Sequence, residues 1–402
     1  MCLAWGGCAD RHDSSASSAP PGVADVVVVA EGAVSGLRLD QIQVLGSHNS
    51  YKLAIRPRLL DLYRGWRGEA ASALDYWHPP LAAQLDHGLR KLELDVFYDP
   101  EGGRYARPGG LVWAPEEGAP EEDELAPDSF DPKGELARPG FKVLHVQDLD
   151  FRSSCLTLAA CLGELRAWSE RHPGHLPIVV TLNAKDQRIE REGLDPAFVE
   201  PLPFDAAALD ALDAEIVAAL GRERLLVPDD VRGDAPSLET AVLERGWPLL
   251  EDVRGRFLFV LDEGGAKLET YLEGHPSLEG RVLFVDVEPR HPAAAVRIVN
   301  DPIERGDEIR DLVRRGYLVR TRADADTREA RAGDTTRRDA AFASGAQFVS
   351  TDYYLSEQAP GTGYLVELPW AVGVRDDGRA TVARCNPVTA ARICMLVGGA
   401  SP

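Results

Sequence analysis

Side chains that can do chemistry follow several short apolar runs in the sequence. His48 and Asn49 end "QVLGSHN", and "KLELDVFYD" places Glu93 and Asp95 two residues apart, on one face of a strand. His145 ends "KVLH" in the same way. Imidazole titrates near neutral pH, and carboxylate and amide oxygens are hard ligands. These residue types therefore suit acid–base chemistry assisted by a divalent cation.

Further apolar runs end in an amide and in cations. "PIVVTLNAKD" ends with Asn183 and Lys185, and "YLVRTRADADT" places Arg320 and Arg322 on one face of a strand. Guanidinium and ammonium groups at such positions can clamp a phosphate. One such residue would mean little, but all these runs end on the same side of the fold predicted below.

The combination suits cleavage of a phosphodiester. Oxygen ligands favour Ca²⁺, in preference to Mg²⁺ and over zinc, and the predicted ligands are Asn49, Glu93, Asp95 and Asn183. The cation would neutralise a phosphate oxygen and acidify an attacking hydroxyl. His48 and His145 would flank the phosphorus, to stabilise the transition state and protonate the leaving alkoxide.

From about residue 37, β-rich runs alternate with helical patterns. Eight strands are predicted, at Gln41–Ser47, Leu89–Val96, Phe141–Val146, Ile178–Leu182, Phe257–Val260, Arg281–Val285, Leu318–Thr321 and Gln347–Ser350. The predicted helices are Leu81–His87, Leu156–Arg171, Asp205–Leu220 (with Gly221 as its stop), Ser237–Arg245, Ile303–Arg315 and Arg337–Ala343. This alternation predicts an α/β fold, a TIM (β/α)₈ barrel, whose active site lies at the carboxyl ends of the strands. No GxGxxG motif follows the first strand, which argues against a dinucleotide-binding fold.

The chain is expected to divide into three parts. Residues 1–36 read as an exported leader and linker, and residues 37–360 as the barrel. A Gly/Pro-rich acidic insertion, residues 99–140, follows the second strand and is typical of a lid or added surface element. Residues 361–402 read as an extension with a β-hairpin that turns at "DDG".

The composition narrows the classes of partner. The 402 residues include 44 Lys+Arg and 65 Asp+Glu, a net charge of −21. Nucleic acid and tight electrostatic adsorption to anionic membranes are disfavoured, because both need clustered cations. No run approaches the apolar length of a transmembrane helix.

Six cysteines fall into three close pairs, Cys2/Cys8, Cys155/Cys161 and Cys385/Cys394. Close pairing without CxxC spacing predicts local disulfides and a secreted or cell-envelope protein; the alternative is buried thiols in a cytosolic enzyme. "LAWGGC" resembles the lipid-attachment box of bacterial lipoproteins, with Cys8 as the acylated residue.

Longer motifs resemble a known family. "GSHNSY", "LELDVF", "HVQDLDFRSSC", "RTRADADT", "RRDAAFASGAQFVSTDYY" and "ARCNPV" are together similar to the bacterial Ca²⁺-dependent phosphoinositide-specific phospholipase C family, over roughly residues 37–395. That family belongs to the phospholipase C-like phosphodiesterase superfamily of TIM barrels. The resemblance implies a monomer in which the inositol 2-hydroxyl attacks phosphorus, releasing diacylglycerol and a cyclic inositol phosphate.

The resemblance also implies roles for single residues. His48 and His145 match the family's catalytic histidines, and strand position suggests that His145 is the general acid and His48 the transition-state stabiliser. Asn183 stands where the superfamily often has an acidic metal ligand, so one negative charge is missing, while Lys185 keeps the family's lysine. Tyr353 could stack on the inositol ring or pack as a rim aromatic.

Two other functions remain open. A glycerophosphodiester phosphodiesterase acting on lipid-free diesters would use the same scaffold, and the acidic surface suits it. A non-catalytic barrel that binds inositol phosphates would explain Asn183. Trp66, Trp77 and Trp113 lie in predicted loops, either as a membrane-contacting rim or as buried structural residues.

Overall fold

A barrel of parallel strands forms the centre of the molecule. The computed structural model describes four stretches of the chain, residues 36–115, 130–369, 373–376 and 380–390. The barrel strands follow the order β6-β5-β4-β2-β1-β9-β8-β7, and a parallel bridge between Asp286 and Val296 links its two ends. The strands are β1 (Ile42–Ser47), β2 (Lys91–Phe97), β4 (Ile178–Ala184), β5 (Phe257–Leu261), β6 (Leu283–Val285), β7 (Val296–Ile298), β8 (Leu318–Arg322) and β9 (Phe348–Thr351). This nearly closed ring confirms the predicted TIM barrel.

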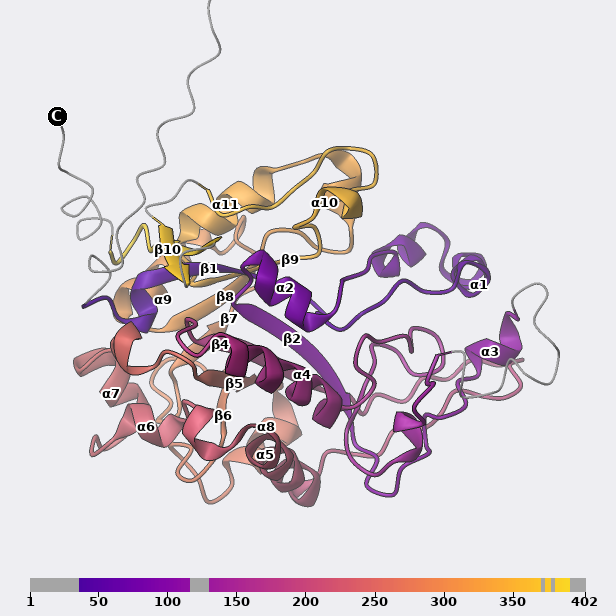
Figure 1. Ribbon diagram of the computed structural model, residues 1–402, viewed down its shortest axis with the longest axis horizontal. Helices are drawn as coiled ribbons and strands as arrows, with labels where there is room; N and C mark the ends of the chain where they lie inside the picture. Colours follow the sequence, from indigo (N-terminus) through magenta and orange to yellow (C-terminus); the bar gives the residue numbers. More distant parts are fainter. Residues whose placement is uncertain (1–35, 116–129, 370–372, 377–379, 391–402) are drawn as a thin grey trace, which may run out of the picture.

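Helices cover the outside of the barrel and also occur in a lobe beside it (Figure 1). They are α1 (Pro57–Arg67), α2 (Leu81–His87), α3 (Gly110–Trp113), α4 (Leu158–Arg171), α5 (Ala206–Leu220), α6 (Pro228–Arg232), α7 (Leu238–Glu244), α8 (Gly265–Leu272), α9 (Gly306–Arg315), α10 (Arg328–Ala332) and α11 (Thr336–Ser344). Helix α5 has the end signals that make a helix predictable from sequence. The side chain of Asp205 caps its first turn by accepting from the backbone of Ala208 at 2.9 Å, and Gly221 ends it with a φ of 83°.

Two predicted features of the barrel were wrong. Of the predicted strand Phe141–Val146, only β3 (Lys142–Val143) forms, and it pairs antiparallel with the end of β2. The chain reaches β3 through the long insertion rather than a helical crossover, so it returns antiparallel and stays outside the barrel. Strand β7 takes the eighth place, and the prediction missed it because it has three residues and no helix separates it from β6.

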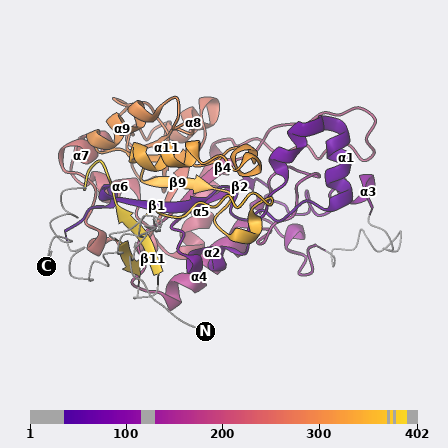
Figure 2. The same ribbon diagram turned by 90° about the horizontal axis from the view of Figure 1, so that it is seen from above.

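A lobe extends from the carboxyl ends of the strands. It is built from segments that follow β1, β2 and β4, and it lies beyond the end of β2 in both views (Figures 1 and 2). Its separate apolar cluster includes the rings of Trp66 and Trp113, 6.0 Å apart, and Phe198 lies 4.7 Å from Trp113. Trp77 is not part of this cluster. Two of the three predicted rim tryptophans therefore lie together in the lobe.

The predicted C-terminal hairpin lies at the opposite end of the barrel, away from the lobe (Figure 2). Strands β10 (Gly373–Asp376) and β11 (Ala380–Cys385) pair antiparallel. Strand β11 also pairs with the beginning of β1, where Ile42 faces Cys385. The hairpin thus covers the amino ends of the strands; its turn, residues 377–379, lies outside the described residues.

One predicted disulfide is confirmed, between Cys155 and Cys161. Cys385 is also disulfide-bonded, while its predicted partner Cys394 lies outside the described residues, as do Cys2 and Cys8. None of the helices in the described part of the chain is both long and apolar enough to cross a bilayer.

Candidate active site

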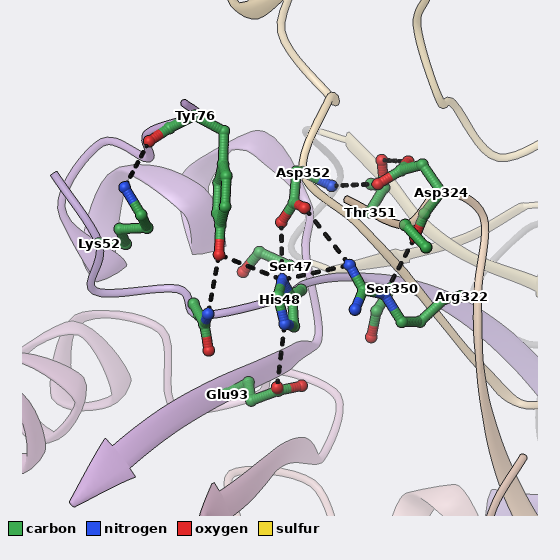
Figure 3. Close-up of polar contacts among 12 residues, drawn as sticks. Ser47, His48, Lys52, Tyr76, Glu93, Arg322, Asp324, Ser350, Thr351 and Asp352 are labelled. Carbon is green, nitrogen blue, oxygen red and sulfur yellow. Dashed lines mark hydrogen bonds and ion pairs between the residues drawn. The ribbon is translucent and has the colours of Figure 1, made fainter. Parts of the chain in front are cut away.

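His48 lies at the centre of a polar cluster at the end of β1 (Figure 3). Its Nδ1 is 3.1 Å from Oδ1 of Asp352 and 3.4 Å from both the Tyr76 hydroxyl and Nη2 of Arg322. Its Nε2 is 3.8 Å from Oε1 of Glu93. The side chain remains 18% exposed, so the ring lies among charged side chains and is still in contact with solvent.

The surroundings of His48 favour the neutral imidazole. Burial lowers its pKa, and the positive charge of Arg322 lowers it further, while Asp352 and Glu93 act in the opposite direction. With Asp352 at Nδ1, the proton of the neutral ring lies on Nδ1 and is donated to that carboxylate. Nε2 is then left as a hydrogen-bond acceptor.

Asp352 follows β9 and is held as a carboxylate. Burial would raise its pKa, but His48, His78 and Arg322 outweigh this and hold the pKa well below its usual range. His78 is buried, donates from Nε2 to the backbone oxygen of His48 at 2.8 Å, and lies 3.5 Å from Oδ1 of Asp352. Asp352 can therefore orient His48 while remaining ionised.

Glu93, on β2, is already surrounded by cations. Its Oε2 accepts hydrogen bonds from Nζ of Lys91 at 2.6 Å and from Nη2 of Arg320 at 2.7 Å. Burial opposes ionisation, but Arg320 and Lys91 hold its pKa well below the usual value. Gly46 makes this possible, because a Cβ there would lie 2.6 Å from Cβ of Lys91. Glu93 is thus fixed and charge-compensated from within the barrel.

Asp95 has a different environment. Both of its carboxylate oxygens are buried without a hydrogen-bond partner, although Nζ of Lys185 lies 3.1 Å from Oδ2. Burial lowers the pKa of Lys185, but the charge of Asp95 outweighs this and raises it. Asn183, on β4, is the register neighbour of Asp95. Asp95 is thus paired with Lys185, and its two buried carboxylate oxygens are hard ligands of the kind that Ca²⁺ prefers.

The predicted calcium ligands come from three adjacent strand ends. Asn49 adopts a left-handed φ of 46°, which asparagine tolerates, and its Nδ2 donates to the Tyr76 hydroxyl at 2.7 Å. Its side-chain oxygen remains available. Among the described residues, no three His, Cys, Asp or Glu side chains form a metal-binding group. The predicted ligands are two carboxylates and two amides. Their oxygens are hard donors of the kind Ca²⁺ prefers, and together they carry two negative charges.

His145 lies in the loop after β3 rather than at the end of a barrel strand. Its Nδ1 donates to Oδ2 of Asp150 at 2.8 Å, and its side chain is partly exposed. Lys52 lies 3.3 Å from the same carboxylate oxygen. His145 is therefore a second imidazole whose Nδ1 is tied to a buried aspartate.

Two predicted substrate-binding residues are placed differently. Tyr353 is buried, and its ring packs edge-on against Tyr364 at 5.8 Å, so it is not available to an inositol ring. Tyr353 follows the end of β9 and packs in an apolar cluster with Ala341 and Phe342 of α11. Arg320 is 3% exposed and is bonded to Glu93, Ser350 and Asn300, which makes it a counter-ion inside the barrel.

The sequence reasoning assigned no role to several residues that build the site. Asp352 follows the last predicted strand, Gln347–Ser350, by two residues, and Asp150 follows His145 by five, so the sequence places both near predicted site residues. Tyr76 and Lys52 lie in loops, and no local sequence pattern predicts that these loops contact the site.

The family described as "Phosphoinositide phospholipase C, Ca2+-dependent" matches residues 37–387 of the chain. Fold and site thus define a barrel enzyme of the phosphoric diester hydrolase class. The chain belongs to the Ca²⁺-dependent phosphoinositide phospholipase C family.

Several solved phospholipase C structures resemble the chain at low sequence identity. No curated protein matches it. A calcium-dependent phosphoinositol-specific phospholipase C from a Pseudomonas species is 15% identical, with a TM-score of 0.49 over 84% of this chain and 97% of that one. The calcium-dependent phosphatidylinositol-specific phospholipase C of Streptomyces antibioticus is 20% identical, with a TM-score of 0.48 over 79% and 96%. For the phosphatidylinositol-specific phospholipase C of Listeria monocytogenes the values are 11%, 0.43, 84% and 98%.

Proposed function

We propose that the chain cleaves phosphatidylinositol to diacylglycerol and a cyclic inositol phosphate. One observation carries this proposal: two imidazoles, His48 and His145, each have Nδ1 bound to a buried aspartate, at 3.1 and 2.8 Å. Such a pair leaves two Nε2 atoms for proton transfer, one to take a proton and one to give it. In-line displacement at phosphorus needs both.

The two histidines would divide the proton transfers. Nε2 of His48 accepts the proton of the inositol 2-hydroxyl as that oxygen forms its bond to phosphorus. As the bond between phosphorus and the glycerol oxygen breaks, Nε2 of His145 gives its proton to the departing oxygen, and diacylglycerol leaves. Lys185, 36% exposed, and the partly exposed Arg322 would bind the phosphate oxygens.

This division revises the role expected for His48. Strand position suggested a transition-state stabiliser, a role that suits a protonated ring. The lowered pKa of His48, caused first by burial and then by Arg322, supports a neutral ring that acts as a base. A base at His48 would also replace any contribution from the acidic residue for which Asn183 substitutes.

Asn49, Glu93, Asp95 and Asn183 would hold Ca²⁺ at the carboxyl ends of β1, β2 and β4. When bound, the ion would neutralise a phosphate oxygen and acidify the attacking hydroxyl. The family's calcium dependence and the buried oxygens of Asp95 support this assignment.

Replacing Asp95 with asparagine is expected to raise the calcium concentration for half-maximal activity by roughly 10- to 100-fold, because one of two anionic ligands is lost. Calcium binding measured by calorimetry should weaken in parallel. Asp61→Asn, a matched change at an exposed carboxylate, should alter neither value. Unchanged calcium binding in Asp95→Asn would remove this residue from the site.

The lobe is the proposed membrane contact. Val112 is 47% exposed on α3, next to the aromatic cluster of Trp66 and Trp113. Apolar and aromatic side chains of this kind insert at lipid interfaces. Val112→Asp should therefore weaken binding to phosphatidylcholine vesicles and slow cleavage of vesicle lipid several-fold, with unchanged turnover of a soluble short-chain substrate. Equal losses on both substrates would count against a membrane role.

Export is a further part of the proposal. The disulfide between Cys155 and Cys161 supports an oxidising compartment, since such bonds rarely persist in the cytosol. Fractionation of expressing cells tests it: recovery with cytosolic markers would contradict export.

The substrate assignment is tested by comparing phosphatidylinositol micelles with glycerophosphoinositol, each with Ca²⁺ and with chelator. We expect calcium-dependent release of diacylglycerol, faster than cleavage of the lipid-free diester. Faster cleavage of glycerophosphoinositol would instead assign a glycerophosphodiester phosphodiesterase. Binding of inositol phosphate without cleavage of either would assign a binding barrel.

A further inference from the structure

A buried lysine lies between the segments that carry the two histidines. Lys52 has no exposed surface, and it follows His48 by four residues. Its Nζ donates to the backbone oxygens of Tyr76 at 2.9 Å and Leu53 at 3.3 Å, and lies 3.3 Å from Oδ2 of Asp150. The ammonium is therefore held by two carbonyls and one carboxylate, from three different segments.

Lys52 is linked to His145 through the carboxylate of Asp150. Oδ2 of Asp150 accepts from Nδ1 of His145 at 2.8 Å, so one oxygen serves both the ammonium and the imidazole. Oδ1 of Asp150 is buried without a hydrogen-bond partner. The orientation of this carboxylate therefore depends on contacts at Oδ2 alone, and Lys52 is its only charged partner there apart from the histidine, among the residues the structure describes.

Lys52 also contacts Tyr76, whose loop lies beside His48. Nζ lies 4.6 Å from the centre of the Tyr76 ring, and the hydroxyl of that ring accepts from Asn49 and lies 3.4 Å from Nδ1 of His48 (Figure 3). Backbone bonds add to the link: Lys52 pairs with Ser153 as an antiparallel bridge. One ammonium thus fixes the loop of Tyr76 and the turn of Asp150 against each other.

Burying such an ion pair is costly. Stability alone does not favour it, because apolar side chains of similar volume often stabilise a fold equally well or better. Stability therefore does not explain why Lys52 is buried against Asp150, the carboxylate bonded to His145.

We propose that Lys52 is a positioning residue for His145 that acts through Asp150. The ammonium holds Oδ2 where it receives Nδ1–H of His145, which aims Nε2 at the departing glycerol oxygen. This inference rests on the proposed function, in which His145 gives its proton to that oxygen. Lys52 touches no reacting atom in this account.

The chain offers a matched control. Lys142 is also fully buried, lies 3.5 Å from a buried carboxylate, that of Asp99, and donates to backbone carbonyls. No histidine shares its carboxylate in the described residues. Lys142→Met therefore measures the cost of removing a buried lysine that does not contact Asp150, the carboxylate bonded to His145.

The test compares two leaving groups in one protein preparation. Phosphatidylinositol needs its alkoxide protonated, whereas an inositol phosphate nitrophenyl ester releases a stable phenolate. We expect Lys52→Met to lower cleavage of the lipid roughly 10- to 100-fold and cleavage of the aryl ester less than about threefold, because loss of general acid assistance spares a good leaving group. Lys142→Met should lower both rates equally. The ratio of the two rates does not depend on the folded fraction.

Two further variants separate the possible failures. Asp150→Asn, close to isosteric, should reproduce the selective loss and serves if Lys52→Met does not fold. His145→Ala should show the largest selective loss, and adding Lys52→Met to it should change the ratio no further. An unselective loss in Lys52→Met beside a selective loss in His145→Ala would overturn this inference alone. An unselective loss in His145→Ala would overturn the proposed role of His145 as well.

Discussion

Replacing His48 with alanine is expected to lower the rate of phosphatidylinositol cleavage by roughly 10²–10⁴-fold, the usual contribution of a positioned general base. The imidazole is held by Asp352 at Nδ1, and its Nε2 faces Glu93 in the mouth of the barrel. Tyr76 and Arg322, which also contact the ring, are poor substitutes for this base, since their pKa values are raised, by burial for Tyr76 and, against burial, by Asp352 for Arg322.

The measurement is the initial rate on phosphatidylinositol micelles at saturating calcium, with melting temperature as a check of folding. His172→Ala is the matched control, because that imidazole bonds the backbone oxygen of Trp168 in α4 and stacks on the ring of the same residue, and it is not one of the proposed site residues. A His48→Ala variant that folds and retains more than about a tenth of the rate would remove His48 from the chemistry.

The second large effect is expected at Asp352. Asparagine there keeps the shape of the side chain but lets the amide present a donor to Nδ1, which favours the wrong tautomer of His48. We expect kcat to fall by roughly 10²–10³-fold, with a smaller change in KM. A loss confined to KM would assign Asp352 to substrate binding instead.

The pH profile gives Asp352→Asn a separate readout. The base must be neutral, so activity rises with pH through the pKa of His48, which burial and Arg322 already place below its ordinary value of 6.5. Asp352 is one of the charges that raise this pKa, so its removal should move the acidic limb of the profile to still lower pH. A shift to higher pH would contradict the electrostatic account.

Much of the site was readable because it lies at strand ends. Apolar runs that stop at His48 or Asn183 predict a position at the carboxyl face once a barrel is assumed; in the structure β1 ends at Ser47 and β4 at Ala184, whereas Glu93 lies inside β2. Helix α5 was predictable from its apolar spacing and from Gly221 after its last turn. The barrel itself follows from the alternation of such segments.

Other features depend on pairing between distant segments. Asp352 and His48 are 304 residues apart in the chain, so no local pattern shows their contact. Strand β7 is too short to show a period, and β3 has a strand-like composition but a direction set by the insertion before it. Of the two alternatives for Tyr353, stacking on inositol or packing as an aromatic, the structure shows the packed one, and the tertiary contacts that decide between them are not visible in the sequence.

The most direct test of the account is to follow the phosphorus of phosphatidylinositol by ³¹P NMR during cleavage with Ca²⁺. Attack by the inositol 2-hydroxyl predicts that a cyclic inositol phosphate appears first, together with diacylglycerol, and carries no oxygen from the solvent when the reaction runs in H₂¹⁸O. A first product that is an acyclic inositol phosphate with ¹⁸O at phosphorus would show direct attack by water and would contradict the proposed mechanism.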